Sequence, residues 1–175
     1  MTFDPASLMG AALPDRALPS SRGGRVNPAR APGRVLVFIY PYTGRPGVPD
    51  PEGWDKIPNA HGSTPQAQAY SAAYSEYLDL GVKVFGLSLQ TPDWQAEAAQ
   101  RLALQVPLLS DADGQWSEAL ALPRFTIGTT HYLRRLTLLA EAGRIIALRF
   151  PVDPPAGDAA HWLQSLRLML PRGQG

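Results

Sequence analysis

The stretch that decides the fold is Val35-Leu-Val-Phe-Ile-Tyr40, an unbroken apolar run that ends at Pro41. It is rich in β-branched and aromatic residues, which is typical of a central parallel strand buried on both faces. Further along, residues 65–80 carry apolar side chains at helical spacing, and residues 82–89 alternate as a second strand does. Two strands joined by a helix in this order predict a right-handed βαβ unit with parallel strands.

The rest of the chain continues the alternation of strands and helices. Thr64 followed by Pro65, and Thr91 followed by Pro92, are signatures of a helix start. Asp158 is expected to cap the last helix. Further elements are predicted as a short apolar run at 106–109, a short helix at 116–122, a hairpin of strands 133–139 and 145–150, and a closing helix with apolar residues Trp162, Leu163, Leu166, Met169 and Leu170. We therefore predict an α/β fold, a thioredoxin-like mixed β-sheet sandwiched by helices.

The composition narrows the class of protein. The chain has 175 residues, 16 Lys and Arg against 15 Asp and Glu, and no Cys. This balance of charge disfavours nucleic-acid binding, and no apolar run approaches the ~20 residues that cross a membrane. Because the first residues also lack the pattern of a signal peptide, a cytoplasmic location is expected. Without Cys, disulfides and thiol catalysis are excluded. The three histidines lie far apart in the sequence, so their spacing predicts no metal or cofactor site.

The first 33 residues differ in composition from the remainder. They are rich in Pro, Gly and Arg, and fit either a small hairpin that turns at Gly23-Gly24 or an extended arm. We expect residues 1–33 to pack on a main domain at residues 34–171, so that the chain forms one structural domain. The arginines of this segment are interleaved with Pro and Gly, which favours a solvated arm over a nucleic-acid contact.

A long loop at residues 41–63 leads to the strongest candidate site. Its 23 residues exceed the ~12–15 beyond which a loop without regular structure is usually functional. Ligands of such folds bind beyond the carboxyl ends of parallel strands, where helix N-termini favour anions. We expect the segment 61–65 to lie there, with an ordinary helix cap after an insertion as the simpler alternative. Trp54 within the loop must be buried either locally or against a partner.

Five segments of the chain occur together in an order that is known from one family. They are 13–21 (LPDRALPSS), 36–47 (LVFIYPYTGRPG), 62–66 (GSTPQ), 106–111 (VPLLSD) and 135–145 (RLTLLAEAGRI). Together they resemble the peroxiredoxins, in particular the bacterioferritin-comigratory (Q-type) branch of the AhpC/TSA-like proteins. The resemblance implies a thioredoxin-like fold with an N-terminal extension and an insertion, and no cofactor or metal. It also implies a hydroperoxide substrate, a thioredoxin-like or small-thiol reductant, and a monomer or homodimer.

The resemblance also implies roles for single residues. In the family, a Pro-x-x-x-Thr-x-x-Cys loop brings a reactive Cys to a helix N-terminus. Carried over to this chain, Pro41 is the motif proline, and Ser63 stands at the position of the peroxidatic Cys. Gln68 stands at the position of a resolving Cys. Arg135 matches the arginine that holds the thiolate and the peroxide.

The chain departs from the family pattern at the motif threonine and at the nucleophile. Thr43 lies two residues after Pro41 and Arg45 lies four after it, and of these two candidates for the threonine's role we rank Thr43 first. At position 63, a serine hydroxyl is hardly ionised at neutral pH. A thiol, in contrast, has a pKa of ~8.5 that a protein can lower to ~3.5–7.5. We therefore expect that the chain as written does not turn over peroxide.

The missing thiol leaves alternatives open. Ser63 is either an engineered replacement in a single-cysteine peroxidase or the result of natural loss, and Gln68 argues against a second replaced Cys. The predicted function is a peroxiredoxin-like scaffold that is inactive as written. The alternative is a non-catalytic thioredoxin-fold binding protein that uses the Ser63 pocket or the loop 41–63. A serine hydrolase is disfavoured, because the sequence has no Gly-x-Ser-x-Gly motif.

Overall fold

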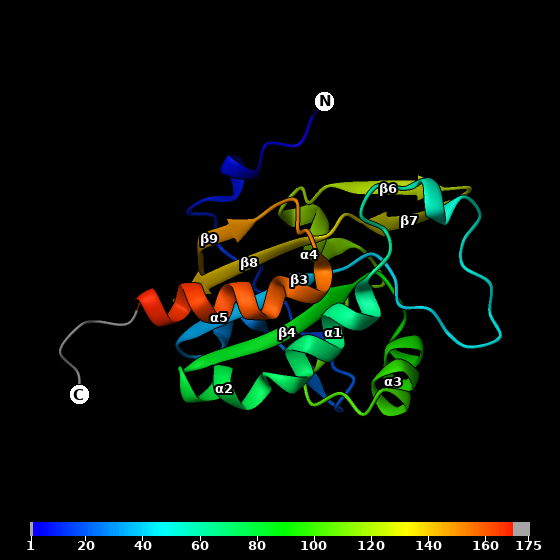
Figure 1. Ribbon diagram of the computed structural model, residues 1–175. Helices are drawn as coiled ribbons and strands as arrows, with labels where there is room; N and C mark the ends of the chain where they lie inside the picture. Colours follow the sequence, from blue (N-terminus) through cyan, green and yellow to red (C-terminus); the bar gives the residue numbers. More distant parts are fainter. Residues whose placement is uncertain (1, 170–175) are drawn as a thin grey trace.

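The central sheet has five strands in the order β5-β4-β3-β8-β9, in a computed structural model that describes residues 2–169. The expected apolar position Leu170 and the expected domain end at 171 lie outside the described residues. The strands are β3 (Arg34–Ile39), β4 (Val82–Ser88), β5 (Leu108–Ser110), β8 (Leu136–Glu141) and β9 (Arg144–Arg149). β3, β4 and β5 run parallel, whereas β8 and β9 are antiparallel to their neighbours. The sheet is therefore mixed, as predicted (Figure 1).

β3 lies in the middle of this sheet, as its sequence indicates. Each residue from 35 to 39 is at most 2% exposed. Leu36 is paired with Val84 on β4 and with Leu139 on β8. Because side chains alternate between the two faces of a sheet, a wholly apolar strand requires cover on both faces.

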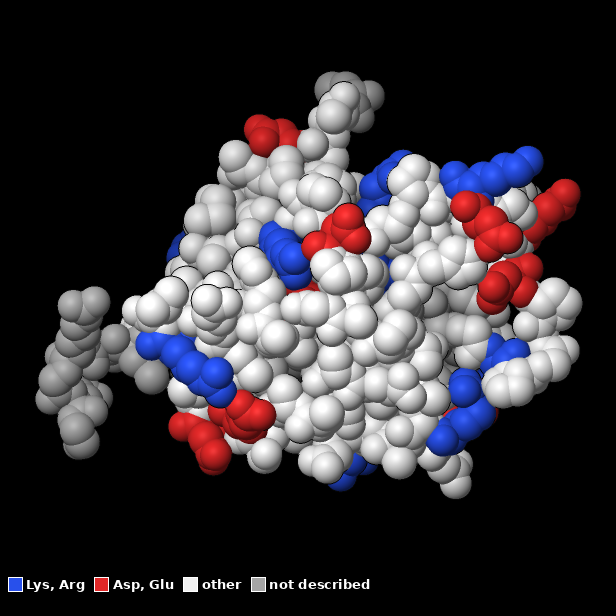
Figure 2. All heavy atoms as spheres, viewed as in Figure 1, with Lys and Arg blue, Asp and Glu red and all other residues white. Residues whose placement is uncertain are grey.

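Helices provide that cover on one face. α1 (Ser63–Ala72), α2 (Tyr74–Asp79) and α5 (Asp158–Met169) lie across the sheet, with α3 (Pro92–Arg101) beside them (Figure 1). Their buried side chains, among them Tyr70 and Trp162, form one core cluster with the strands. Figure 2 shows that the outer surface of this layer is mainly uncharged at its centre, with charges of both signs around its edge. No helix in residues 2–169 is long and apolar enough to span a membrane.

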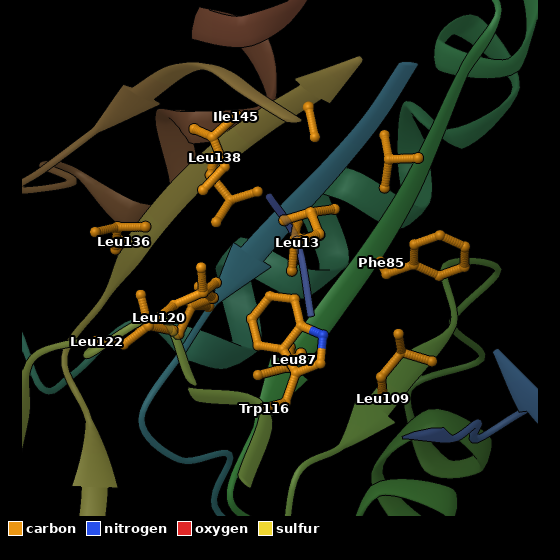
Figure 3. Close-up of a cluster of buried hydrophobic side chains, with 14 of the residues drawn as sticks. Leu13, Phe85, Leu87, Leu109, Trp116, Leu120, Leu122, Leu136, Leu138 and Ile145 are labelled. Carbon is orange, nitrogen blue, oxygen red and sulfur yellow. The ribbon is translucent and has the colours of Figure 1, made fainter. Parts of the chain in front are cut away.

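The opposite face is covered by α4 (Gln115–Ala119) and by the N-terminal segment. Figure 3 shows Trp116 of α4 among the leucines of the strands, with Leu13 of the N-terminal segment beside it. Of the two alternatives for this segment, the structure contains the hairpin, in which β1 (Leu18–Pro19) pairs with β2 (Arg25–Val26). The short helices η1 (Pro5–Leu8) and η2 (Pro28–Arg30) flank it. The division of the chain at residues 33 and 34 stays a prediction.

Two predicted elements are each divided in the structure. The single helix expected at 65–80 is broken at Ala73 between α1 and α2, where ψ is 3°. Ala is a strong helix former, so the sequence around residue 73 gives no signal for the break. The hydroxyls of Tyr70 on α1 and Tyr77 on α2 both donate to the first turn of α5, and these contacts constrain the two helices. The strand expected at 133–139 is also divided, because residues up to Leu133 belong to a separate hairpin. That hairpin consists of β6 (Arg124–Ile127) and β7 (Thr130–Leu133) and turns at Gly128.

Asp158 does not cap α5, contrary to the prediction. Its own dihedral angles are helical, and it follows the short helix η4 (Pro155–Gly157). Its carboxylate turns inward, is fully buried, and accepts hydrogen bonds from other side chains. Such long-range bonds outcompete a local cap and leave no trace in the sequence around residue 158.

Candidate functional site

Ser63 lies at the start of α1, directly above the carboxyl ends of the parallel strands, and is 3% exposed. The helix begins with Gly62 at the cap position and without a capping side chain, so the expected cap at Thr64 is wrong. The first peptide N–H groups of a helix have no intrahelical acceptor. Residue 63 therefore sits where amide donors and a partial positive charge favour an anion.

Arg135 brings a buried guanidinium to Ser63 from the bend between β7 and β8, although 72 positions separate the two residues. Its side chain is almost fully buried, and its Nη2 lies 3.1 Å from the Ser63 Oγ, to which it donates. Its Nη1 donates to the Gln66 Oε1 at 2.5 Å. The remaining acceptors are the backbone carbonyls of Asn59, Ala60 and His61, at 3.2 to 3.4 Å. The guanidinium therefore ties the end of the loop to the first turn of α1.

The charge of Arg135 is the main electrostatic feature of the site. Burial lowers the pKa of Arg135 to about 10, because desolvation disfavours its charged form. The guanidinium is thus still charged at neutral pH. None of its described hydrogen-bond acceptors is a carboxylate. The positive charge is consequently available to an anion that forms or binds at residue 63.

Ser63 opens onto a pocket of about 260 Å³. Asp50 and Trp54 from the loop and Thr64 and Pro65 from α1 contribute to its lining. In the described residues, the Ser63 hydroxyl accepts from Arg135 but has no acceptor for its own proton. The pocket therefore has room for a small molecule and can offer it a hydroxyl donor.

Pro41 and Thr43 do not line the Ser63 pocket. Pro41 lines a second cavity of about 200 Å³, together with Gln90 and Trp94. The Thr43 Oγ1 donates to the Gln90 Oε1 at 3.0 Å, and its carbonyl accepts from the Trp94 Nε1 at 2.8 Å. The structure thus ties this part of the loop to Gln90, between β4 and α3, and to Trp94 of α3. Any role of Pro41 and Thr43 at residue 63 stays a prediction.

The other candidate for the threonine role and the loop tryptophan are also held elsewhere. Arg45 stacks over the ring of Trp94 at 4.1 Å and pairs with Glu97 at 3.1 Å. Trp54 is 4% exposed and packs against aromatic rings of the loop and of the β6–β7 hairpin, namely Tyr42, Phe125 and Tyr132. Of the two alternatives for Trp54, the structure contains local burial.

On α1, the glutamine that faces the site is Gln66 and not Gln68. Gln68 is exposed, and five residues of helix place it roughly 140° around the axis from Ser63. Gln66 is fully buried and bonded to Arg135. Sequence analysis missed this residue, although its spacing of three from Ser63 puts the two on one helix face. The assignment of Gln68 to a resolving position stays a prediction.

The structure gives no support to a serine hydrolase or to a metal centre. The exposed His61 ring bonds to Asp55 at 2.5 Å, whereas the Ser63 Oγ is bonded to Arg135. A nucleophilic serine needs a base in contact with its hydroxyl. Within residues 2–169, no group of three His, Cys, Asp or Glu side chains is arranged to hold a metal ion.

Gly62 carries a backbone requirement that can be tested. Its φ of 109° lies in the left-handed region, and an added Cβ would be 2.8 Å from the Cγ of Pro155. We expect Gly62→Ala to lower the free energy of unfolding by about 3 kcal/mol, the sum of backbone strain and overpacking. Urea denaturation measures this. Gly53→Ala is the matched control, since Gly53 also has positive φ but open space around it; equal losses in both variants would contradict the close contact.

The fold and this site define the class of protein. A thioredoxin-like mixed sheet with a buried arginine at the start of α1 is accompanied by a match of residues 8–163 to the Redoxin family. The chain belongs to the Redoxin family. Among individual proteins, it is 24% identical over 164 residues to a Mycobacterium tuberculosis protein that is provisionally named a peroxiredoxin. The match covers 90% of this chain and 97% of that relative.

Solved structures share the same fold. The crystal structure of the peroxidoxin BcpB from Mycobacterium tuberculosis has a TM-score of 0.75 and 21% identity, and covers 93% of this chain and 98% of its own. The bacterioferritin comigratory protein of Xanthomonas campestris, studied for its alkyl peroxide reduction activity, has a TM-score of 0.69 and 21% identity, with 94% and 95% covered. At these identities the likeness is one of fold, and the chemistry of this chain has to be argued from its own residues.

Proposed function

We propose that this chain is a peroxiredoxin-type peroxidase scaffold whose catalytic step is silent because residue 63 is Ser. The observation that carries the proposal is the contact of 3.1 Å between the Arg135 Nη2 and the Ser63 Oγ at the start of a helix. A buried cation and a helix N-terminus are the two features that lower the pKa of a thiol and make it a nucleophile. Neither feature makes a serine hydroxyl a nucleophile in this way, because that hydroxyl stays neutral.

The chemistry that the site would support with a thiol can be written in full. A thiolate at residue 63 attacks one oxygen of a hydroperoxide, an S–O bond forms, and the O–O bond breaks. The leaving alkoxide or hydroxide takes up a proton, and the sulfur becomes a sulfenic acid. The Arg135 guanidinium stabilises the negative charge as it moves from sulfur to the leaving oxygen. An external dithiol then reduces the sulfenic acid and returns the thiol.

Comparing the chain that carries Ser63 with its Ser63→Cys variant tests this proposal. Both proteins are mixed with hydrogen peroxide or an alkyl hydroperoxide and a dithiol reductant, and peroxide consumption is followed. We expect no turnover by the chain with Ser63 and turnover by the variant. A variant that folds normally but consumes peroxide no faster than free thiol would contradict the proposed role of residue 63.

A second candidate function, a non-catalytic binding protein, follows from the same pocket. Within residues 2–169, Arg135 is hydrogen-bonded to no carboxylate, and it contacts Ser63, which lines a pocket of about 260 Å³ with room for a small oxyanion or carboxylate. Chemical shifts of the Arg135 side chain in the protein with Ser63, titrated with acetate or benzoate, measure such binding. Saturation at submillimolar ligand supports a binding role, whereas unchanged shifts argue against it.

Several finer expectations stay predictions within this proposal. They concern the reductant, the monomeric or dimeric state, the cytoplasmic location, and the roles of Pro41, Thr43 and Gln68. The origin of Ser63, engineered or natural, is decided by the codon for residue 63 in the source genome. A Cys codon there would identify the natural protein as a single-cysteine peroxidase.

A further inference from the structure

The buried carboxylate of Asp158 accepts hydrogen bonds from four side chains and is linked to the Ser63 site through one of them, Gln66. It is fully buried at the start of α5. Its Oδ2 accepts hydrogen bonds from Tyr70 at 2.5 Å, Thr137 at 2.6 Å and Gln66 at 3.1 Å. Its Oδ1 accepts from the Arg149 Nη1 at 2.9 Å. Three elements of the fold, α1, β8 and β9, therefore converge on one carboxylate.

These contacts keep Asp158 an acceptor. A buried carboxylate is tolerated where a cation and several hydrogen bonds satisfy it, and Arg149 supplies the cation. Burial and the neighbouring Asp158 raise the pKa of Tyr70 well above its usual value, so the phenol stays protonated and donates. Every side chain that touches the carboxylate thus presents a hydrogen to it.

The polarity of Gln66 follows from this arrangement. An ionised carboxylate only accepts hydrogen bonds, so Gln66 must turn its NH₂ group toward Asp158. Its carbonyl oxygen then points the other way, to the Arg135 Nη1 at 2.5 Å. Gln66 is also the only described acceptor of that Nη1 atom. A flipped amide would place an NH₂ group against the guanidinium and lose this bond.

We propose that Asp158 is a positioning residue of the site, which fixes the amide of Gln66 and thereby holds the Arg135 guanidinium against residue 63. The proposal rests on the proposed function, because it concerns the activation of a nucleophile at residue 63. Its chain of contacts runs from the Asp158 Oδ2 through Gln66 to Arg135 and ends at the Ser63 Oγ. A purely structural role, in which Asp158 only docks α5, is the alternative.

The test measures the pKa of a thiol at residue 63, by absorbance of the thiolate at 240 nm against pH. In the Ser63→Cys protein, the side-chain amide that Asp158→Asn introduces cannot satisfy all of its neighbours in either orientation. Its NH₂ group faces either Arg149 or the three donors, Gln66 among them. We expect the thiol pKa to rise by about one unit, which is about 10-fold less thiolate at pH 7. Loss of a nearby negative charge alone would lower the thiol pKa, so the expected rise opposes the direct electrostatic effect.

Tyr77→Phe is the matched control. The Tyr77 hydroxyl donates to the carbonyl of Ala159 at 2.6 Å, so this variant also removes a buried bond to the start of α5. It does not touch Gln66 or Arg135. We expect a loss of stability without a change in the thiol pKa. If Tyr77→Phe raises the thiol pKa as much as Asp158→Asn does, docking of α5 explains the effect and the proposal is overturned.

A double-mutant cycle shows whether Asp158 acts through Gln66. Gln66→Met should raise the thiol pKa by itself, and Asp158→Asn should then raise it no further, because the intermediary is gone and only the direct loss of a negative charge, which lowers the thiol pKa, remains. Additive shifts would overturn the proposal. Should Asp158→Asn not fold, Asp158→Glu keeps the charge and displaces the acceptor by one methylene, and an unchanged thiol pKa in that variant counts against the proposal.

The outcomes separate this inference from the proposed function. A Ser63→Cys protein with an ordinary thiol pKa would refute the proposed function before Asp158 is considered. A lowered thiol pKa that Asp158→Asn leaves unchanged, or lowers further, would refute the positioning role alone.

Discussion

A Ser63→Cys variant is expected to react with hydrogen peroxide about 10³- to 10⁴-fold faster than free cysteine at pH 7. Two separate effects combine. A thiol pKa lowered below 7 raises the thiolate fraction from a few per cent to most of the protein, roughly a 20-fold gain. A fixed cationic donor beside the reacting atoms contributes a further ~10²–10³. The Arg135 Nη2, 3.1 Å from the Oγ of residue 63, is the group that we expect to supply it. Stopped-flow fluorescence of the tryptophans after mixing with peroxide measures the rate.

A second serine supplies the control for this rate. Ser75 lies near the start of α2 and is exposed, with no arginine bonded to its side chain in the described residues. Ser75→Cys should therefore react at the rate of a free thiol. Equal rates for cysteines at 63 and 75 would show that the pocket adds nothing to the chemistry.

The second large effect is expected for Arg135. In the Ser63→Cys protein, Arg135→Met should slow the reaction with peroxide by about 10²–10³ and raise the thiol pKa toward its ordinary value. It should also destabilise the protein by about 2–4 kcal/mol, because several buried acceptors lose their donor. Arg135→Lys restores the charge but not the planar donor group, so we expect an intermediate rate.

Arg134 offers a matched control for the loss of positive charge. It is adjacent in sequence, exposed, and stacked at 5.8 Å over Phe125 on the β6–β7 hairpin. Arg134→Met removes the same charge without touching residue 63, and both the rate and the thiol pKa should stay unchanged. A loss of rate similar to that of Arg135→Met would mean that general electrostatics, and not the contact with residue 63, controls the thiol.

The sequence predicts those parts of the fold that local patterns encode. The run 35–40 becomes the central strand β3, and the Thr91-Pro92 signature starts α3, where the Thr91 hydroxyl accepts from the Trp94 N–H. The division at Ala73 and the inward turn of Asp158 were not predictable in this way. Both depend on contacts between α5 and distant elements, and such contacts override helix propensity and capping preference.

The candidate site shows the same division between local and distant information. Ser63 and Arg135 could be paired only through the resemblance to a family, because no local pattern connects the start of α1 with the segment between β7 and β8, 72 positions away. Helical spacing from Ser63 points to Gln66, whereas the family resemblance points to Gln68. Thr43 is bonded to Gln90 between β4 and α3, a contact between distant segments that no local pattern indicates.

The pKa of the thiol in the Ser63→Cys protein tests the central claim most directly, because it depends on the pocket and not on any reductant or substrate. Titration of the 240 nm absorbance gives this value in the folded protein, with unfolded protein as the reference. The account predicts a pKa below about 7, lowered by Arg135 and by the start of α1. A pKa at or above about 8.5, the value of a free thiol, would contradict it.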